Sequence, residues 1–345
     1  MTASPLAMAD ISVIVPMGGA ASGPSVDPTT GGGAHVIPSD HINIGMNNPI
    51  PPKNIYAPAD GYLLQIMYVQ SRWLAPDGSR LDDYALTFQI AKNLFVYVTH
   101  MTDLSADVKG LVGTLKPANA GNLFQFPIKA GTLMGVTGGS TYLKTFDLIA
   151  DDVSYSPPGF FLTRYYKDPP ISVDPIAYYD EPLRSQLYAM LPNRPAPRIG
   201  RYYYDLQGEL VGAWCAGPEA AKDPVIMFCY DNLDPSQLRV ADQGVNTVYA
   251  IYGNAPDPAT ITVASGLTKY EIYDASSTSG ASGPHTVLLV KMLDNLTLET
   301  EYFPGKTAAQ VSDFDANAVT TATISRLENR DATRTDWAVG AAKAS

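Results

Sequence analysis

The sequence predicts a mainly β protein made of two antiparallel β-rich regions, joined by a short linker that holds one helix. Short apolar runs rich in β-branched and aromatic residues recur along the chain, and Gly, Pro, Asn and Asp separate them. The 21 Tyr and 10 Phe suit pleated, half-buried surfaces, and the 28 Gly and 28 Pro supply frequent turns. A chain of 345 residues is long enough for two hydrophobic cores.

The first β region is expected over residues 35–152, after a loose N-terminal arm at 1–34 in which only 11–15 has the pattern of a strand. Its strands are expected at 62–69, 84–91, 94–99 and 146–150. Their spacing, with no helical block between them, is typical of a compact barrel or sandwich.

A proline-rich linker is expected at 153–200, where Leu183, Leu187 and Met190 have helical spacing. The second β region follows at 201–330, and 331–345 is expected to be a flexible tail. Explicit turns predict an antiparallel meander, as a barrel or a sandwich. Its strands are expected at 201–206, 210–215, 225–230, 247–252, 260–263, 269–273, 286–293 and 297–303.

Charge and hydropathy exclude several classes of partner. The net charge of −11 argues against nucleic acid, whose binding depends on Lys and Arg that neutralise phosphates. No apolar run reaches the length of about 18 residues that a membrane span needs. The first residues lack the basic and apolar segments of a signal peptide, so any leader is expected to be missing from this chain.

Two cysteines, Cys215 and Cys229, flank a segment with turn signals. A hairpin there would bring them close together, so a disulfide is one possibility and a pair of buried thiols is the other. A disulfide would support a location outside the cytoplasm.

Three segments of the first region resemble the lysostaphin-type zinc metallopeptidases, which cut peptide cross-links in bacterial cell walls. They are IYAPADGYL at 55–63, VYVTHM at 96–101 and IKAGTLMGVTGGSTYLKTFDLI at 128–149. The resemblance implies that residues 35–152 form the family's barrel, with a duplicated hybrid motif. It also implies that His100 occupies the place of a histidine that assists catalysis.

The metal ligands of this family are only partly present. The family binds zinc through a His-x-x-x-Asp element and the second histidine of a His-x-His strand. Here Gly45 stands where an aspartate would follow His41, and the final strand reads Thr145-Phe146-Asp147 where the family has His-x-His. Zinc held by His41 and Asp147, with His35 or Asp40 as a third ligand, is one possibility. A barrel that has lost its metal site, and needs no cofactor, is the favoured interpretation.

The second region carries two fainter signals. Gly212-Ala213-Trp214 resembles the opening strand of lipocalin-like (calycin) barrels, in which Arg326 would be the partner of the tryptophan. The segment 280–287 resembles a metallopeptidase signature only superficially, because Val287 replaces its second histidine. His285 is therefore expected to be an exposed loop residue.

Tyrosines gather around the linker. Exposed tyrosines can stack on sugars or form a protein interface, whereas buried ones would hold the two β regions together. The candidate binding residues are Tyr165, Tyr166, Tyr178, Tyr179 and Tyr203.

These observations favour a non-catalytic, exported protein of the cell envelope or surface. It would bind glycan, peptidoglycan or a protein partner through the peptidase-like barrel or the tyrosine-rich junction. One alternative is a zinc metallopeptidase with an atypical, aspartate-containing site and His100 as a catalytic residue. Another is a structural subunit of an extracellular β-rich assembly, in which a low-charge, tyrosine-rich chain packs against copies of itself.

Overall fold

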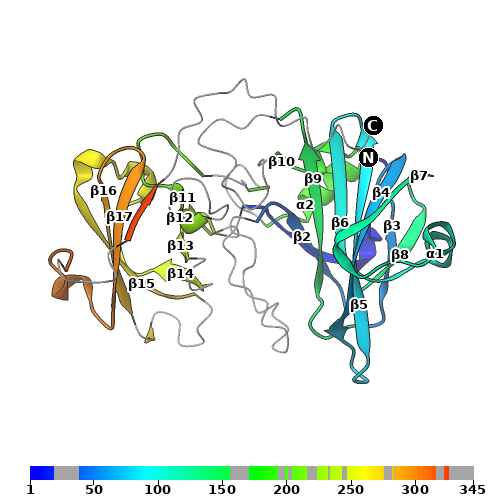
Figure 1. Cartoon of the computed structure of the whole chain (residues 1–345), viewed down its shortest axis with the longest axis horizontal. Helices are drawn as coiled ribbons and strands as arrows, with labels where there is room; N and C mark the ends of the chain where they lie inside the picture. The colour runs from blue at the N-terminus through cyan, green and yellow to red at the C-terminus, as the bar shows by residue number, and fades with distance from the viewer. Residues whose placement is uncertain are drawn as a thin grey trace.

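In the computed structural model, the chain forms two β-rich bodies, a ten-stranded sheet and a closed barrel of eight strands (Figure 1). The predicted mainly β fold class is therefore confirmed. The structure describes residues 1–18, 39–155, 171–192, 199–200, 204–215, 224–231, 234–242, 247–275, 282–283, 285–315 and 322–325. No helix in these ranges is long and apolar enough to cross a membrane.

The sheet body has the strand order β1-β2-β9-β6-β5-β4-β7, and β8 joins it beside β6, β3 beside β8 and β10 beside β9. Its ten strands are β1 (Ile11–Val15), β2 (Ile42–Met46), β3 (Lys53–Tyr56), β4 (Gly61–Leu74), β5 (Arg80–Ala91), β6 (Leu94–Leu104), β7 (Ala118–Ile128), β8 (Leu133–Thr137), β9 (Thr145–Asp152) and β10 (Ser172–Val173). All the pairings are antiparallel.

Apolar side chains at alternating positions build the core of this body, because successive residues of a strand face opposite sides. Ile66, Leu86 and Val98 lie opposite one another on β4, β5 and β6 and are fully buried. Burial of this apolar surface away from water is the main contribution to the stability of the sheet body.

Two segments that the sequence assigned elsewhere belong to the sheet body. The assumed arm contributes Leu6, which is fully buried, and the strand β1. The assumed linker contributes the predicted helix, α2 (Leu183–Ala189), whose Leu187 packs into the same core. The hydrophobic cost of exposing these side chains explains why neither segment remains loose. Residues 19–38 lie outside the described ranges.

A second helix, α1 (Ala106–Val112), was not predicted. The Ser105 side chain caps it by accepting a hydrogen bond from the backbone N–H of Val108, and Gly113 follows its last residue with a positive φ. Serine before a short helix and glycine after it are ordinary start and stop signals. The signal is present in the sequence, but seven residues are too few for a clear apolar periodicity.

The barrel body is an up-and-down meander in which each strand pairs with the next and β18 pairs with β11. Its strands are β11 (Gly212–Cys215), β12 (Pro224–Tyr230), β13 (Leu238–Asp242), β14 (Thr247–Ile251), β15 (Leu267–Asp274), β16 (Thr286–Met292), β17 (Thr297–Pro304) and β18 (Ala322–Ser325). Large buried side chains, including Trp214, Phe228 and Tyr270, fill its interior. The Trp214 indole donates to the carbonyl oxygen of Leu210, and Arg326 lies outside the described residues.

Two predictions for the barrel are wrong. The expected strand at 260–263 is replaced by two 3-10 turns, Pro258–Thr260 and Val263–Ser265; proline at the first position of a turn is pre-set for it. The strand register does not fit the proposed disulfide, and Cys229 is buried in the barrel. Cys215 pairs with Pro224, so Cys229 lies five residues further along β12, about 16 Å away. That separation exceeds the span of a disulfide.

Candidate functional site

A chain of charged side chains crosses one face of the sheet body, over β2, β9, β6, β5 and β4. Antiparallel neighbours directly opposite each other share a face, so the register places these side chains together. Asn43 is opposite Asp147, and Asp83 is opposite Val69. We call this surface the charged face.

Asp147, on β9, is the centre of the cluster and accepts contacts at both carboxylate oxygens. Asn43 donates to Oδ1 at 2.6 Å, and His41 Nε2 lies 3.7 Å from the same oxygen. Thr99 donates to Oδ2 at 2.9 Å, and His100 Nε2 lies 3.1 Å from it. The carboxylate is buried, with 6 % of the residue exposed.

The chain of contacts extends in both directions from Asp147. On one side, His41 Nδ1 lies 2.7 Å from a carboxylate oxygen of Asp40. On the other, His100 Nδ1 lies 3.2 Å from Asp83, whose second oxygen is 3.2 Å from a guanidinium nitrogen of Arg72. The order Asp40, His41, Asp147, His100, Asp83, Arg72 therefore alternates acid and base.

Irregular backbone geometry occurs at or beside two residues of this ion-pair series, His100 and Arg72. His100 has a φ of 59° and Ser71, next to Arg72, has a φ of 57°, both in the left-handed region that non-glycine residues rarely adopt. The pairing register shifts on β4 between Val69 and Trp73. Thr137 donates to the backbone carbonyl of His100 at 2.6 Å and holds it there. Such strain, about 1–3 kcal/mol per residue, persists only where the surroundings impose it.

Electrostatics keeps the central pair ionised. Burial alone would lower the pKa of His100, but attraction to Asp147 and Asp83 outweighs it and raises this pKa to about 10. Burial would raise the pKa of Asp147, yet the neighbouring His41 and His100 hold it well below its ordinary range. His100 is therefore an imidazolium at neutral pH, between two carboxylates.

We expect the stability of the sheet body to fall as pH rises above about 6.5, the ordinary histidine pKa. Between that pH and about 10 the folded state keeps a proton on His100 that the unfolded chain has released, so stability declines. Asp147 acts oppositely, and its contribution is lost as pH falls below about 4. Urea unfolding from about pH 2 to 10 measures this profile.

The slope of the alkaline decline is at most about 1.4 kcal/mol per pH unit for one proton. His100→Gln serves as the control, since glutamine carries no titrating proton and should remove that slope. A wild-type stability that stays flat between pH 6.5 and 9 would contradict the assignment of a charged His100.

The sequence-predicted ligands His41, Asp40 and Asp147 do lie together, and His100 lies with them, whereas His35 is outside the described residues. They do not fit a zinc ion. A ligand needs a free lone pair, and a carboxylate has about four acceptor sites. Four groups already face that of Asp147: Asn43 and His41 at Oδ1, and Thr99 and His100 at Oδ2. Within the described ranges, no group of three or more His, Cys, Asp or Glu is placed to hold a metal.

Two of the five candidate binding tyrosines, Tyr178 and Tyr179, lie within the described residues. Tyr179 is 1 % exposed and belongs to the sheet-body core, and burial raises the pKa of its hydroxyl. Tyr178 is partly buried against that core and donates to Asp152 at 3.1 Å. The positions of Tyr165, Tyr166 and Tyr203 fall outside the described ranges.

His285 is not the exposed loop residue that the sequence suggested. Its side chain is 17 % exposed, and Nδ1 lies 2.6 Å from a carboxylate oxygen of Glu271. The rings of Tyr252 and Tyr273 flank the imidazole at 4.6 and 6.2 Å. The β15–β16 register explains this, because it continues from Ile272–Thr286 to place His285 across from Tyr273.

Sequence reasoning missed four residues of the charged face: Arg72, Asp83, Asn43 and Thr99. Their only signal is a polar residue inside an apolar strand pattern, which in most proteins marks a solvent-facing position. The 17-residue separation of Asp83 from His100 depends on the β5–β6 hairpin register, and no local pattern reveals it.

The fold and the site together define a mainly β protein with two bodies and a buried acid–base chain on one sheet face. No family model matches this chain, and no curated protein matches it. Among solved structures, the NMR solution structure of lysostaphin is similar at 11 % identity and a TM-score of 0.16. The likeness covers 61 % of this chain and 78 % of that chain.

Proposed function

We propose that this chain is a non-catalytic binding protein of the cell envelope or surface, with peptidoglycan, another glycan or a protein as its partner. One observation carries the proposal: among the described candidate site residues, Asp40, His41, His100 and Asp147 each already have an acid or base partner. His100 faces carboxylates at both ring nitrogens, so it offers no lone pair to a metal or a proton.

The resemblance of residues 35–152 to lysostaphin-type metallopeptidases supports the cell-wall ligand and the location. In this proposal the sheet body is a degenerate barrel retained from such an enzyme. The row of ion pairs stabilises the strands that a metal ion held together in that enzyme. The same contacts argue against the alternative of an aspartate-containing zinc peptidase, because a metal there would have to separate Asp147 from His41 and His100.

A pelleting assay with insoluble peptidoglycan tests the proposal. Protein purified without chelator is expected in the pellet, with no soluble peptide released, and EDTA should change neither result. Elemental analysis of the same preparation gives its zinc content. One zinc per chain together with EDTA-sensitive release of peptides would overturn the proposal, and absence from the pellet would remove peptidoglycan as the ligand.

A further inference from the structure

Arg72 offers one side of its guanidinium to the surroundings. One of its terminal nitrogens forms the ion pair with Asp83, and the guanidinium lies 5.2 Å from the centre of the Trp73 ring. The side chain remains 35 % exposed, whereas that of Asp83 is 8 % exposed. An arginine fork has five N–H donors, so donors remain for a ligand.

The row of ion pairs from Asp147 to Asp83 holds the Arg72 guanidinium in place. Asp83 is itself fixed by His100, which Asp147 fixes in turn. Trp73 packs edge-on against the His100 ring at 5.4 Å, so the aromatic support under the guanidinium is rigid as well. A guanidinium held in this way loses little rotamer entropy when it binds a carboxylate, which favours a bidentate contact.

Exposed apolar side chains continue from Arg72 across the same face. Val69 is opposite Asp83 and is 37 % exposed; two residues along, Met67 is 40 % exposed. On the neighbouring strand β7, Leu123 lies opposite Gln65 and is 77 % exposed. Alternation along β4 places Gln65, Met67 and Val69 on one side, so these apolar groups form a stripe beside the fork.

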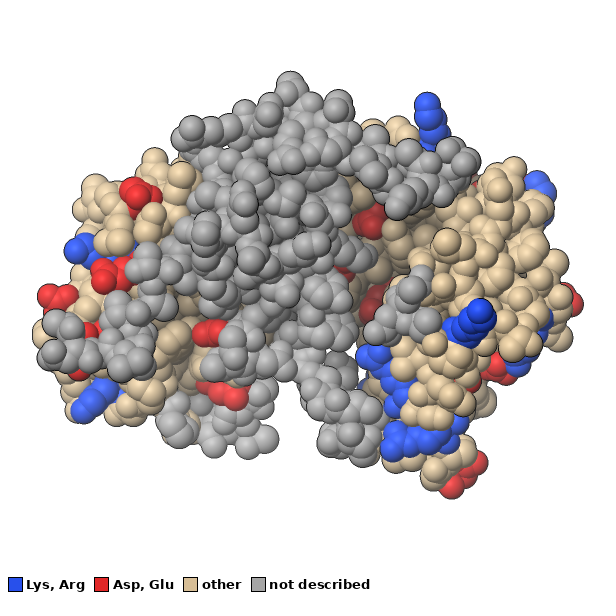
Figure 2. Space-filling view, in the orientation of Figure 1, with Lys and Arg blue, Asp and Glu red and all other residues tan. Residues whose placement is uncertain are grey.

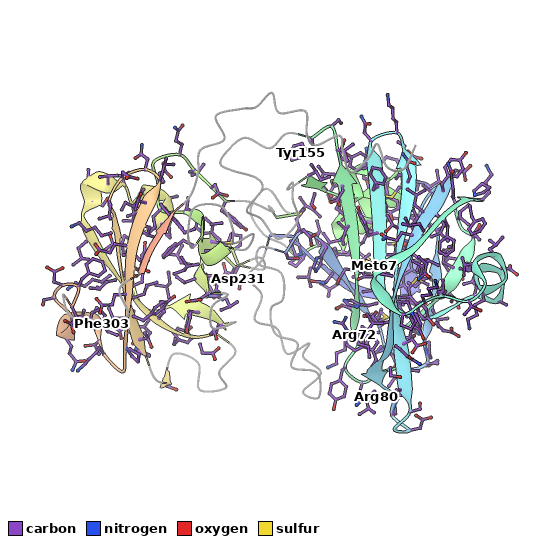
Figure 3. All side chains as sticks on the ribbon, viewed as in Figure 1. Met67, Arg72, Arg80, Tyr155, Asp231 and Phe303 are labelled. Atoms are coloured by element: carbon purple, nitrogen blue, oxygen red, sulfur yellow. The ribbon has the colours of Figure 1, made fainter. Side chains whose placement is uncertain are left out.

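The charge distribution identifies the sign of the occupant. The chain as a whole carries −11, yet Figure 2 shows Lys and Arg gathered over the lower part of the sheet body. Figure 3 labels Met67, Arg72 and Arg80 in succession along this region. A basic local surface attracts partners that carry negative charge.

We infer that Arg72 and the stripe of Met67, Val69 and Leu123 form a docking site for a peptide segment of a partner that carries carboxylates between apolar side chains. The carboxylate binds the free side of the Arg72 fork, and the apolar side chains cover the stripe. This inference rests on the proposed binding function and specifies the partner chemistry of the same face.

The test uses fluorescence anisotropy with the full chain and three labelled hexapeptides, which alternate leucine with glutamate, leucine with glutamine, or serine with glutamate. Only the leucine–glutamate peptide should bind well. Arg72→Gln should weaken its binding about tenfold or more, as expected for the loss of a held charge partner. Arg80→Gln is the matched control; it removes the same charge from an exposed site and should change binding less than about twofold.

Met67→Ser and Val69→Ser change the apolar stripe and leave the ion-pair residues as they are. They therefore test the docking site even if the Arg72→Gln variant does not fold. Each should weaken binding several-fold. Equal binding of all three peptides, or equal effects of the two arginine variants, would overturn the inference. Inorganic phosphate that competes as well as the peptide would also overturn it, because that result indicates a simple anion site. Self-association that Arg72→Gln abolishes would overturn it too, because the occupant would then be a second copy of this chain.

The two proposals fail in different ways. Cleavage of the hexapeptide would overturn the non-catalytic function while leaving the docking site in place. Retention on peptidoglycan that is unaltered by Arg72→Gln and Met67→Ser, with no hexapeptide binding, would preserve the function and overturn the docking site.

Discussion

Asp147→Asn is expected to destabilise the sheet body by about 3–5 kcal/mol, the range for removing one partner of a buried ion pair. The substitution conserves shape but replaces one acceptor oxygen by an NH₂ donor. Oδ1 now faces the Asn43 amide nitrogen and Oδ2 faces the Nε2–H of the His100 imidazolium. An amide NH₂ at either position therefore meets a donor, and the imidazolium cannot turn to accept from it. It also leaves the His100 imidazolium with Asp83 as its remaining carboxylate contact.

Urea unfolding, followed by a probe specific to the sheet body, measures this effect. Asp60→Asn is the control, because Asp60 also pairs with a base, Lys129, at 2.7 Å but the two side chains are 63 % and 83 % exposed. Exposed pairs contribute little, so no measurable change is expected there. If Asp147→Asn were as stable as Asp60→Asn, the acid–base chain would not be holding the strands together.

The contrast between these two aspartates shows what the sequence could predict. The strands of the sheet body are visible as apolar alternation, because one face is buried and the period is local. The position of Asp147 beside His41 and His100 was predicted through the resemblance to a metallopeptidase, and the structure places the three together. Their interpretation as metal ligands remains a prediction; Asn43 and Thr99, whose contacts with Asp147 complete the site, have no recognisable signal in the sequence.

The disulfide and the linker failed for a related reason. Both depend on register and on packing between distant residues. A shift of the β11–β12 turn decides whether Cys229 meets Cys215 or Val211, and the sequence of the turn does not fix where it is centred. Likewise, proline-rich composition indicates irregular backbone, but it does not show that Leu187 and Ile176 fill the sheet-body core.

Trp214→Ala is expected to destabilise the barrel by about 3–5 kcal/mol, the usual cost of truncating a large buried aromatic side chain. Trp214 is fully buried and lies on β11, the strand through which the barrel closes against β18. Its loss removes packing from the closing strand and leaves the Leu210 carbonyl without the indole donor that now bonds it at 2.8 Å.

Trp214→Phe separates these two contributions, because phenylalanine keeps most of the apolar surface and lacks the N–H. We expect it to cost about 1–3 kcal/mol, from the orphaned carbonyl and the smaller ring. Leu293→Ala, at a side chain 45 % exposed, is the control and should be close to neutral. The barrel interior is a cluster of its own, and Ala213 on β11 is the barrel residue that belongs to the sheet-body core, so the barrel transition should move most in urea. A single transition that shifts as a whole would show instead that the two bodies unfold as one cooperative unit.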